Sequence, residues 1–311
     1  VDLVVMTRDV FTLYGSFEPL STTAYKVSVE EANAGGMGQR IRVAGLYDAD
    51  RNSRFGYEAV YQKFNILGSF VDASVGYSRI NTGISVGNEN EVGYFFRLNR
   101  MLFHPFVRWA GGLGISEYNS TNVYAKADSV FVPYRYSVQD YWVGYSFGHA
   151  NPLKVWKENR NRRFVAVRAF EQRFSELPDF ELTEPDRFAY RSRQSVLAEI
   201  TFFRQDFYKT QYVAGFGRTE DIPYGYRASF TTGWEIELGN QRAYLGSQVY
   251  YTSIQPSGTI LTYQVKLAAY IQGAATEDGL LSLHFRRFSQ AYSMGRKKIR
   301  HQIETGYSWL F

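Results

Sequence analysis

The sequence has no long apolar run, no cysteine and no concentrated charge. None of its apolar stretches approaches the roughly 20 residues that a membrane-spanning helix needs. The absence of cysteine suits an oxidising envelope compartment, although many cytosolic proteins also lack it. The net charge of +5 is spread along 311 residues, and we therefore expect no nucleic-acid partner, which would require a clustered basic face. No signal peptide begins at Val1, so we expect either a mature chain or the C-terminal part of a longer one.

Aromatic residues are abundant, at 17% of the chain, although the mean hydropathy is negative. The apolar residues recur at every second position. Leu261, Tyr263, Val265, Leu267, Ala269 and Ile271 alternate with mostly polar residues, and the segment 302–311 repeats the pattern. A strand with one face in lipid and the other in a polar lumen requires this alternation. The sequence therefore predicts an all-β protein, a transmembrane antiparallel β-barrel in the outer membrane of a Gram-negative bacterium, with outer-membrane lipid as its surroundings.

We expect about sixteen strands, an even number as bacterial barrels require. Residues 1–7 are interpreted as the end of a periplasmic linker and residues 8–311 as the barrel. A soluble β-sandwich or propeller would also alternate, but the aromatics here gather toward strand ends, as interfacial girdles do. The expected strand centres are Leu13, Val27, Val43, Tyr57, Val75, Phe95, Gly111, Val143, Val167, Glu199, Val213, Thr231, Gln248, Val265, Leu283 and Glu304.

The connections form two sets, as expected for short periplasmic turns opposite long external loops. The short set comprises residues 34–38, 65–68 and 238–240, and the long set comprises Asn119 to Arg135 and Ser175 to Asp186. The segment Gly148 to Arg163 is long and basic but falls on the short side. Its cations could contact anionic lipid headgroups, and a solvated turn explains them equally well. They are Lys154, Lys157, Arg160, Arg162 and Arg163.

The C-terminal segment has the most specific motif. Glu304, Gly306, Trp309 and Phe311 have the polar-x-Gly-x-x-aromatic-x-aromatic spacing of an outer-membrane assembly signal. Such a strand must present free backbone groups before the barrel closes. We therefore expect the chain to end where the natural protein ends.

Four segments together resemble the BamA/TamA surface-antigen superfamily, particularly its divergent members from Bacteroidetes-like bacteria. They are Thr7 to Leu13, Glu30 to Asn33, Asp48 to Ser53 and Gly217 to Tyr226. The resemblance implies sixteen strands and a sixth external loop that folds into the lumen, where its arginine pairs with acidic residues of the wall. Arg218, followed by Thr219, Glu220 and Asp221, matches that arginine in position, with Glu235 and Glu237 as the expected partners. This chain departs from the family motif after the arginine, and a solvated loop arginine is the alternative reading.

The family resemblance further implies insertion or translocation of proteins, or of lipids, at a lateral seam between the first and last strands. Client barrels would be the partners, by addition of a strand to an open edge. The family's periplasmic POTRA domains are missing here, so the chain either follows an unobserved periplasmic part or is a barrel-only member. The alternative functions are a structural or accessory barrel, with envelope-complex subunits as partners, and a diffusion pore.

Catalytic and metal sites are not expected, and neither is a cofactor. Ser282 and His284 share one strand face but lie about 7 Å apart by strand rise, too far for a direct hydrogen bond. No acid is evident beside them in the sequence. The remaining histidines, His104, His149 and His301, are scattered and have no metal-ligand spacing.

Overall fold

The computed structural model describes residues 11–82, 89–103, 107–147, 161–178, 190–213, 219–237, 239–273 and 275–311. Strands dominate it, with two short 3-10 turns, η1 (Ala34–Gly36) and η2 (Ile66–Gly68). The strands are β1 (Leu13–Pro19), β2 (Ala24–Glu31), β3 (Gln39–Asp48), β4 (Phe55–Lys63), β5 (Asp72–Thr82), β6 (Asn90–Arg100), β7 (Trp109–Thr121), β8 (Arg135–Phe147), β9 (Arg162–Glu176), β10 (Arg193–Gln211), β11 (Thr219–Glu237), β12 (Asn240–Ile254), β13 (Ile260–Gln272), β14 (Ala275–Phe288), β15 (Tyr292–Met294), β16 (Lys297–Ile299) and β17 (Gln302–Leu310).

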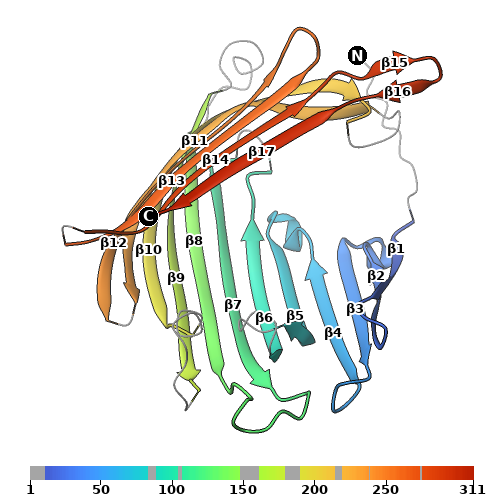
Figure 1. Cartoon of the computed structure of the whole chain (residues 1–311), viewed down its shortest axis with the longest axis vertical. Helices are drawn as coiled ribbons and strands as arrows, with labels where there is room; N and C mark the ends of the chain where they lie inside the picture. The colour runs from blue at the N-terminus through green and yellow to red at the C-terminus, as the bar shows by residue number, and fades with distance from the viewer. Residues whose placement is uncertain are drawn as a thin grey trace. The chain divides into compact units, whose positions relative to one another are not determined.

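One sheet of 15 strands follows the chain order from β1 to β14 and ends with β17. From β1 to β14 each strand therefore pairs with the next strand in sequence, and β14 pairs with β17 (Figure 1). β15 and β16 form a separate two-stranded sheet. The all-β class and the antiparallel arrangement are as predicted, and among the described residues β1 and β17 each have one strand partner, β2 and β14 respectively.

The prediction of about sixteen strands is wrong at one position. Val213, an expected strand centre, lies in a bend after β10, which is a single strand of 19 residues. The segments predicted around Phe95 and Val167 are strands, β6 and β9. In an antiparallel meander, successive strands run in opposite directions. Because the predicted strand at Val213 is not formed, every later strand runs opposite to the direction that the sixteen-strand prediction gave it.

This reversal corrects the grouping of the connections. Residues 122–134 follow the odd-numbered β7, and the tight turn between Glu237 and Asn240 follows the odd-numbered β11. Residues 34–38 and 65–68, by contrast, follow the even-numbered β2 and β4. The turn at 238–240, where Gly239 adopts a φ of 81°, therefore belongs with the long connections and not with residues 34–38 and 65–68.

The chain divides into two compact units. The first comprises residues 1–101, 111–141 and 170–193, and the second comprises residues 102–110, 142–169 and 194–311. In the second unit, one sheet face carries exposed apolar side chains, such as Trp234 (59% exposed) and Leu267 (50%). The opposite face holds buried polar side chains, among them Thr252 and Thr262, each 3% exposed and paired across β12 and β13.

The first unit repeats this arrangement. Val29 and Val43 oppose each other across β2 and β3 and are 50% and 52% exposed. Their chain neighbours Ser28 and Ala44 also form a pair but point the other way, at 9% and 1% exposed. We call the exposed face of each unit its apolar face and the other its polar face. In both units, then, the usual arrangement of a water-soluble protein is inverted.

Several predicted features lie outside the described residues: the linker at 1–7, His104, His149, the cations between 154 and 160, and residues 179–186 of a predicted loop. Of the basic segment, Arg162 and Arg163 are described and begin β9. No helix in the described part of the chain combines the length and apolar character needed to cross a membrane.

Candidate functional site

The polar face of the second unit carries a buried charge centre around Arg242. Its Nη2 donates to Glu235 Oε1 at 3.0 Å and to Glu237 Oε2 at 2.9 Å, and its Nη1 donates to Asp278 Oδ2 at 2.7 Å. Glu277 Oε2 lies 3.6 Å from Nη1. The three residues Arg242, Glu235 and Glu237 are each below 10% exposed. We call this group of one guanidinium and four carboxylates the Arg242 centre.

A tyrosine completes the Arg242 centre. The hydroxyl of Tyr270 donates to Glu235 Oε2 at 3.1 Å. Its ring lies under the guanidinium, with Arg242 Cζ at 4.2 Å from the ring centroid. Both oxygens of Glu235 and both terminal nitrogens of Arg242 are therefore hydrogen-bonded, which a buried ion pair needs if its desolvation is to be offset.

Local chain geometry creates the Arg242 centre. β11 and β12 are joined by a two-residue turn, which fixes their register so that Glu235 lies opposite Arg242. Asp278 and Glu277 arrive from β14, whose register with β13 shifts at a bulge between Ala268 and Tyr270. Glu235 and Glu237 were expected from the sequence to accept hydrogen bonds from Arg218, and Arg242 was not predicted. The short spacing between the two strands, across residues 238–239, could have indicated that Glu235 lies opposite Arg242.

The predicted donor was Arg218, which lies outside the described residues. Thr219, Glu220 and Asp221 were expected in the same inward loop, but they are the first residues of β11. They stand at the end of that strand opposite to Glu235 and Glu237. With about 14 residues between Asp221 and Glu235, the two groups are roughly 46 Å apart along the strand.

A second polar network lies in the first unit, around Glu91. Its carboxylate accepts hydrogen bonds from the hydroxyls of Tyr134 (2.9 Å) and Tyr136 (3.3 Å). Beside it, Lys126 Nζ lies 2.8 Å from Glu89 Oε1. Tyr134 is fully buried, and burial, followed by the charge of Glu91, raises its pKa above the ordinary tyrosine value.

This network holds the connection between β7 and β8 against the polar face. The same connection reaches the end of β3, where the Tyr124 hydroxyl donates to Asp48 Oδ2 at 3.3 Å. The backbone N–H of Asn52 donates to the carbonyl of Val123 at 2.5 Å. Residues 122–134 are therefore an ordered loop within the first unit. A long loop was predicted here from the sequence, but its contacts with Asp48 and Asn52 were not.

The C-terminal strand brings an acid to the histidine considered in the sequence. His284 Nε2 lies 2.8 Å from Glu304 Oε1. A carboxylate therefore lies beside this histidine, although none is evident from the sequence. Ser282, however, is hydrogen-bonded to Ser308 at 3.3 Å across the strand pair. No Ser–His hydrogen bond forms among these residues, and no group of metal-binding side chains occurs within the described ranges.

The other predicted residues of the assembly signal lie along β17 and just beyond it. Gly306 faces His284 across the pair of strands. Trp309 and Phe311 are about half exposed on the apolar face, with ring centroids 5.0 Å apart. The ring of Phe311 covers Gly279, where a Cβ would lie 2.4 Å from its Cε2, and the two residues exchange backbone hydrogen bonds.

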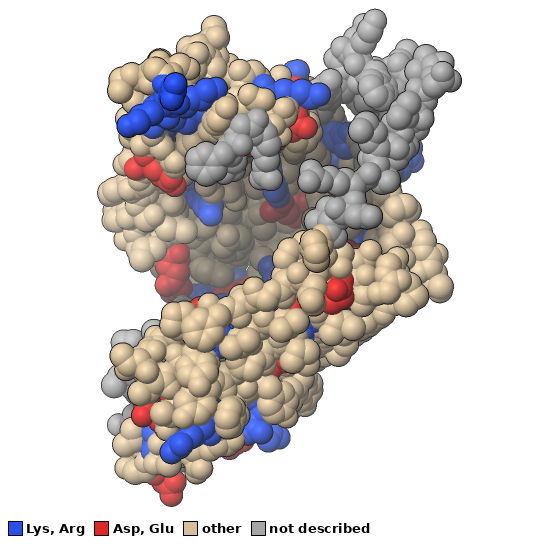
Figure 2. Space-filling view, turned by 90° about the vertical axis from the view of Figure 1, so that its right-hand side faces the viewer, with Lys and Arg blue, Asp and Glu red and all other residues tan. Residues whose placement is uncertain are grey.

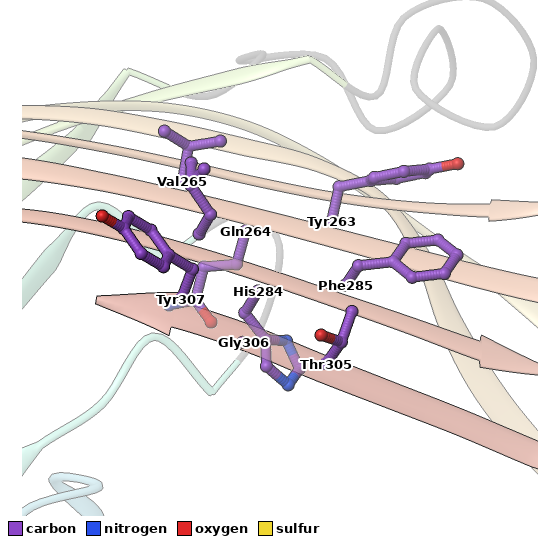
Figure 3. A pocket seen from close by; sticks show the side chains of 9 residues that line it. Tyr263, Gln264, Val265, His284, Phe285, Thr305, Gly306 and Tyr307 are labelled. Atoms are coloured by element: carbon purple, nitrogen blue, oxygen red, sulfur yellow. The ribbon is translucent and has the colours of Figure 1, made fainter. Parts of the chain in front are cut away.

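A shallow pocket of about 260 Å³ opens on β13, β14 and β17. Figure 3 shows Tyr263 and Phe285 on one side of it and Tyr307 and Val265 on the other. These four side chains belong to the apolar face, so the pocket suits an apolar occupant and offers no cluster of reactive groups.

In comparisons with known proteins, no family model matches the chain, and no curated protein or solved structure resembles it significantly.

Proposed function

We propose that this chain spans the outer membrane of a Gram-negative bacterium as an antiparallel β-barrel, with its apolar face against lipid and its polar face lining a lumen. One observation carries the proposal: in both units one sheet face presents large, exposed apolar side chains, whereas the other holds buried polar and charged ones. Val43 is 52% exposed and Leu267 50%, whereas Glu91 is 3% and Glu235 8% exposed.

The energetics favour a lipid environment. Full burial of a Val, Leu or Phe side chain is worth roughly 1.5–3 kcal/mol, so half-exposed ones each forgo on the order of 1 kcal/mol in water. On β13 the apolar run extends from Leu261 to Ile271, about 33 Å along the strand. A tilt of about 40° reduces this to roughly 25 Å, the height of the apolar band of bacterial barrels. In Figure 2, the broad surface in the lower half of the view carries few charged side chains.

Aromatic rows near the strand ends support the same conclusion. In the first unit, Phe17, Tyr25, Tyr47 and Phe55 form a continuous row across β1 to β4, with neighbouring ring centroids 5.1–6.0 Å apart. In the second unit, Tyr251, Tyr263 and Phe285 form a row across β12 to β14. Aromatic rings at this level suit the boundary between hydrocarbon and headgroups.

Cysteine scanning of β13 tests the proposal, because the chain has no native cysteine. Single cysteines at Tyr263, Val265 and Leu267, and at Gln264 and Lys266, would carry a fluorophore in the full chain reconstituted in vesicles. We expect quenchers attached to acyl chains to act at the first three positions, and aqueous quenchers to act at the other two. Equal quenching at all five positions would show that β13 does not separate lipid from water.

A second candidate function, insertion or translocation of client proteins, is favoured by the edge strands. β1 has 7 residues and β17 has 9, compared with 19 for β10 and β11. Within the described residues each has one strand partner. The second edge of such a strand can accept a client strand through its backbone N–H and C=O groups.

Photocrosslinking tests this candidate in living cells. A photoreactive residue at Gly15 of β1 or Thr305 of β17 should capture outer-membrane precursors during their synthesis, and one at Val265 in central β13 should not. If the edge positions capture no more precursor than Val265, the chain is a structural barrel or a pore. A large, steady current in planar bilayers would then identify the pore.

A further inference from the structure

The hairpin of β15 and β16 stands apart from the main sheet. It lies in the connection between β14 and β17 and forms its own two-stranded sheet (Figure 1, upper right). Every residue from Tyr292 to Ile299 is exposed. Tyr292 pairs with Ile299 and Met294 pairs with Lys297, so three apolar side chains share one face of the hairpin. Tyr292 is 52% exposed, Ile299 46% and Met294 64%.

The base of this hairpin is firmly anchored. Ser289, 1% exposed, donates its N–H to the carbonyl of His301 at 3.0 Å, and its Oγ accepts the N–H of His301 at 3.1 Å. The Arg300 guanidinium donates to the carbonyl of Tyr212. Lys298 Nζ lies 3.9 Å from the centroid of the Tyr212 ring. The hairpin is therefore held in one position relative to the end of β10.

The hairpin is strongly basic. Arg296, Lys297, Lys298 and Arg300 lie within five residues, and no Asp or Glu occurs between Asp278 and Glu304. Within the described part of the chain, no carboxylate forms an ion pair with Arg296, Lys297 or Lys298, and the carboxylate that acts on Arg300 is Glu220. Figure 2 shows Lys and Arg side chains gathered in the upper part of the view, at the height of β15 and β16 in Figure 1.

The hairpin begins where the apolar face of β14 ends. Leu281, Leu283 and Phe285 alternate along that face, and the next outward position is Arg287, which pairs with Leu261 and Ile303. A cation in this row marks the level at which the hydrocarbon band gives way to headgroups. The hairpin follows directly, so its cations lie at that boundary.

We propose that the hairpin docks onto the anionic headgroup layer of the membrane. Arg296 and Lys297, the two cations that do not anchor the hairpin to Tyr212, pair with lipid phosphates, and Tyr292, Met294 and Ile299 enter the interfacial region. Charge selects the partner. A zwitterionic surface offers no net attraction to these cations, whereas an anionic surface strengthens membrane binding about five-fold for each cation. The inference rests on the proposed membrane-spanning function.

The test uses the full chain with a fluorophore on Met294→Cys, on the apolar face of the hairpin, in vesicles of zwitterionic lipid or of zwitterionic lipid with about one third anionic lipid. We expect the anionic vesicles alone to shield the label from an aqueous quencher. The variant Arg296→Gln/Lys297→Gln should lower the ratio of docked to undocked hairpin by roughly 25-fold, from two contributions of about five-fold each. Lys26→Gln/Arg54→Gln removes the same charge from the first unit and should leave the shielding unchanged.

Three outcomes would overturn the docking proposal: equal shielding in both vesicle types, shielding by free inorganic phosphate at zero anionic lipid, or shielding that survives the double Gln substitution in the hairpin. A label on Leu267→Cys in the same vesicles separates the two proposals. If the Leu267 label is reached by acyl-chain quenchers while the Met294 label remains in water, the chain spans the membrane and the hairpin does not dock. If neither label meets lipid, the membrane-spanning function itself is wrong.

Discussion

Removal of the Arg242 guanidinium should destabilise the second unit strongly. Arg242→Ala leaves Glu235 and Glu237 buried without their cation, and both are below 10% exposed. Asp278 and Glu277 are 55% and 40% exposed at their side chains, so water can solvate them. The cost therefore comes mainly from the two buried carboxylates.

The expected size follows from measured buried ion pairs. Removal of one partner typically costs about 3–5 kcal/mol, because an uncompensated charge stays buried. That is a large part of the roughly 5–15 kcal/mol by which folded proteins are stable. A triple variant, Arg242→Met with Glu235→Gln and Glu237→Gln, removes all three buried charges. It should recover most of the loss, since the amide carbonyl that Glu235→Gln introduces can still accept the hydrogen bond from Tyr270.

Denaturant unfolding of the vesicle-reconstituted chain, followed by fluorescence of its five tryptophans, measures these free energies. Arg227→Ala is the matched control. The Arg227 side chain is 64% exposed and lies 3.7 Å from Glu199, and such exposed pairs contribute less than about 1 kcal/mol. The reasoning fails if Arg242→Ala costs no more than the Arg227 control. It also fails if the triple variant is no more stable than Arg242→Ala.

Three further predictions concern other parts of the chain. Val265→Arg places a charge in the middle of the apolar face of β13, and should lower the free energy of unfolding in vesicles by about 2–4 kcal/mol; a loss below about 0.5 kcal/mol would contradict lipid contact at this position. The raised pKa of Tyr134 favours its neutral form in the folded state. The stability that Tyr134 gives the fold is therefore fully present below the ordinary tyrosine pKa and is lost as the pH rises above about 10. Above that pH, the free energy of unfolding of the wild type should fall by up to about 1.4 kcal/mol per pH unit more than that of Tyr134→Phe. Parallel pH profiles of the two free energies would show that the Glu91 network does not hold this proton. Gly279→Ala forces a methyl group against the ring of Phe311, 2.4 Å away, and should weaken the pairing of β14 with β17, seen as faster amide exchange in residues 302–310; Phe311→Ala should remove the effect.

Local pattern predicted much of this fold. Alternation identified the apolar face of β13 because side chains on a strand point to opposite faces with a period of two, whatever the strand packs against. The same rule located β6 and β9 around Phe95 and Val167. It failed near Val213, because the long strand β10 continues through Arg204 and Asp206, polar residues that in sequence resemble the end of a strand.

The candidate site divides in a similar way. Glu235 and Arg242 are separated by a two-residue turn, so their pairing is fixed by local hairpin register and was available from the sequence, although the arginine was sought elsewhere. Glu91 and Tyr134 are 43 positions apart and Asp48 and Tyr124 are 76 apart. No local rule brings such residues together, because their contact depends on the path of residues 122–134 over strands already paired. The sequence by itself determined which side chains meet each face of the strands, since that depends on backbone geometry alone. The tertiary structure decided which buried charges are neutralised and by what, since that depends on where distant segments come to lie.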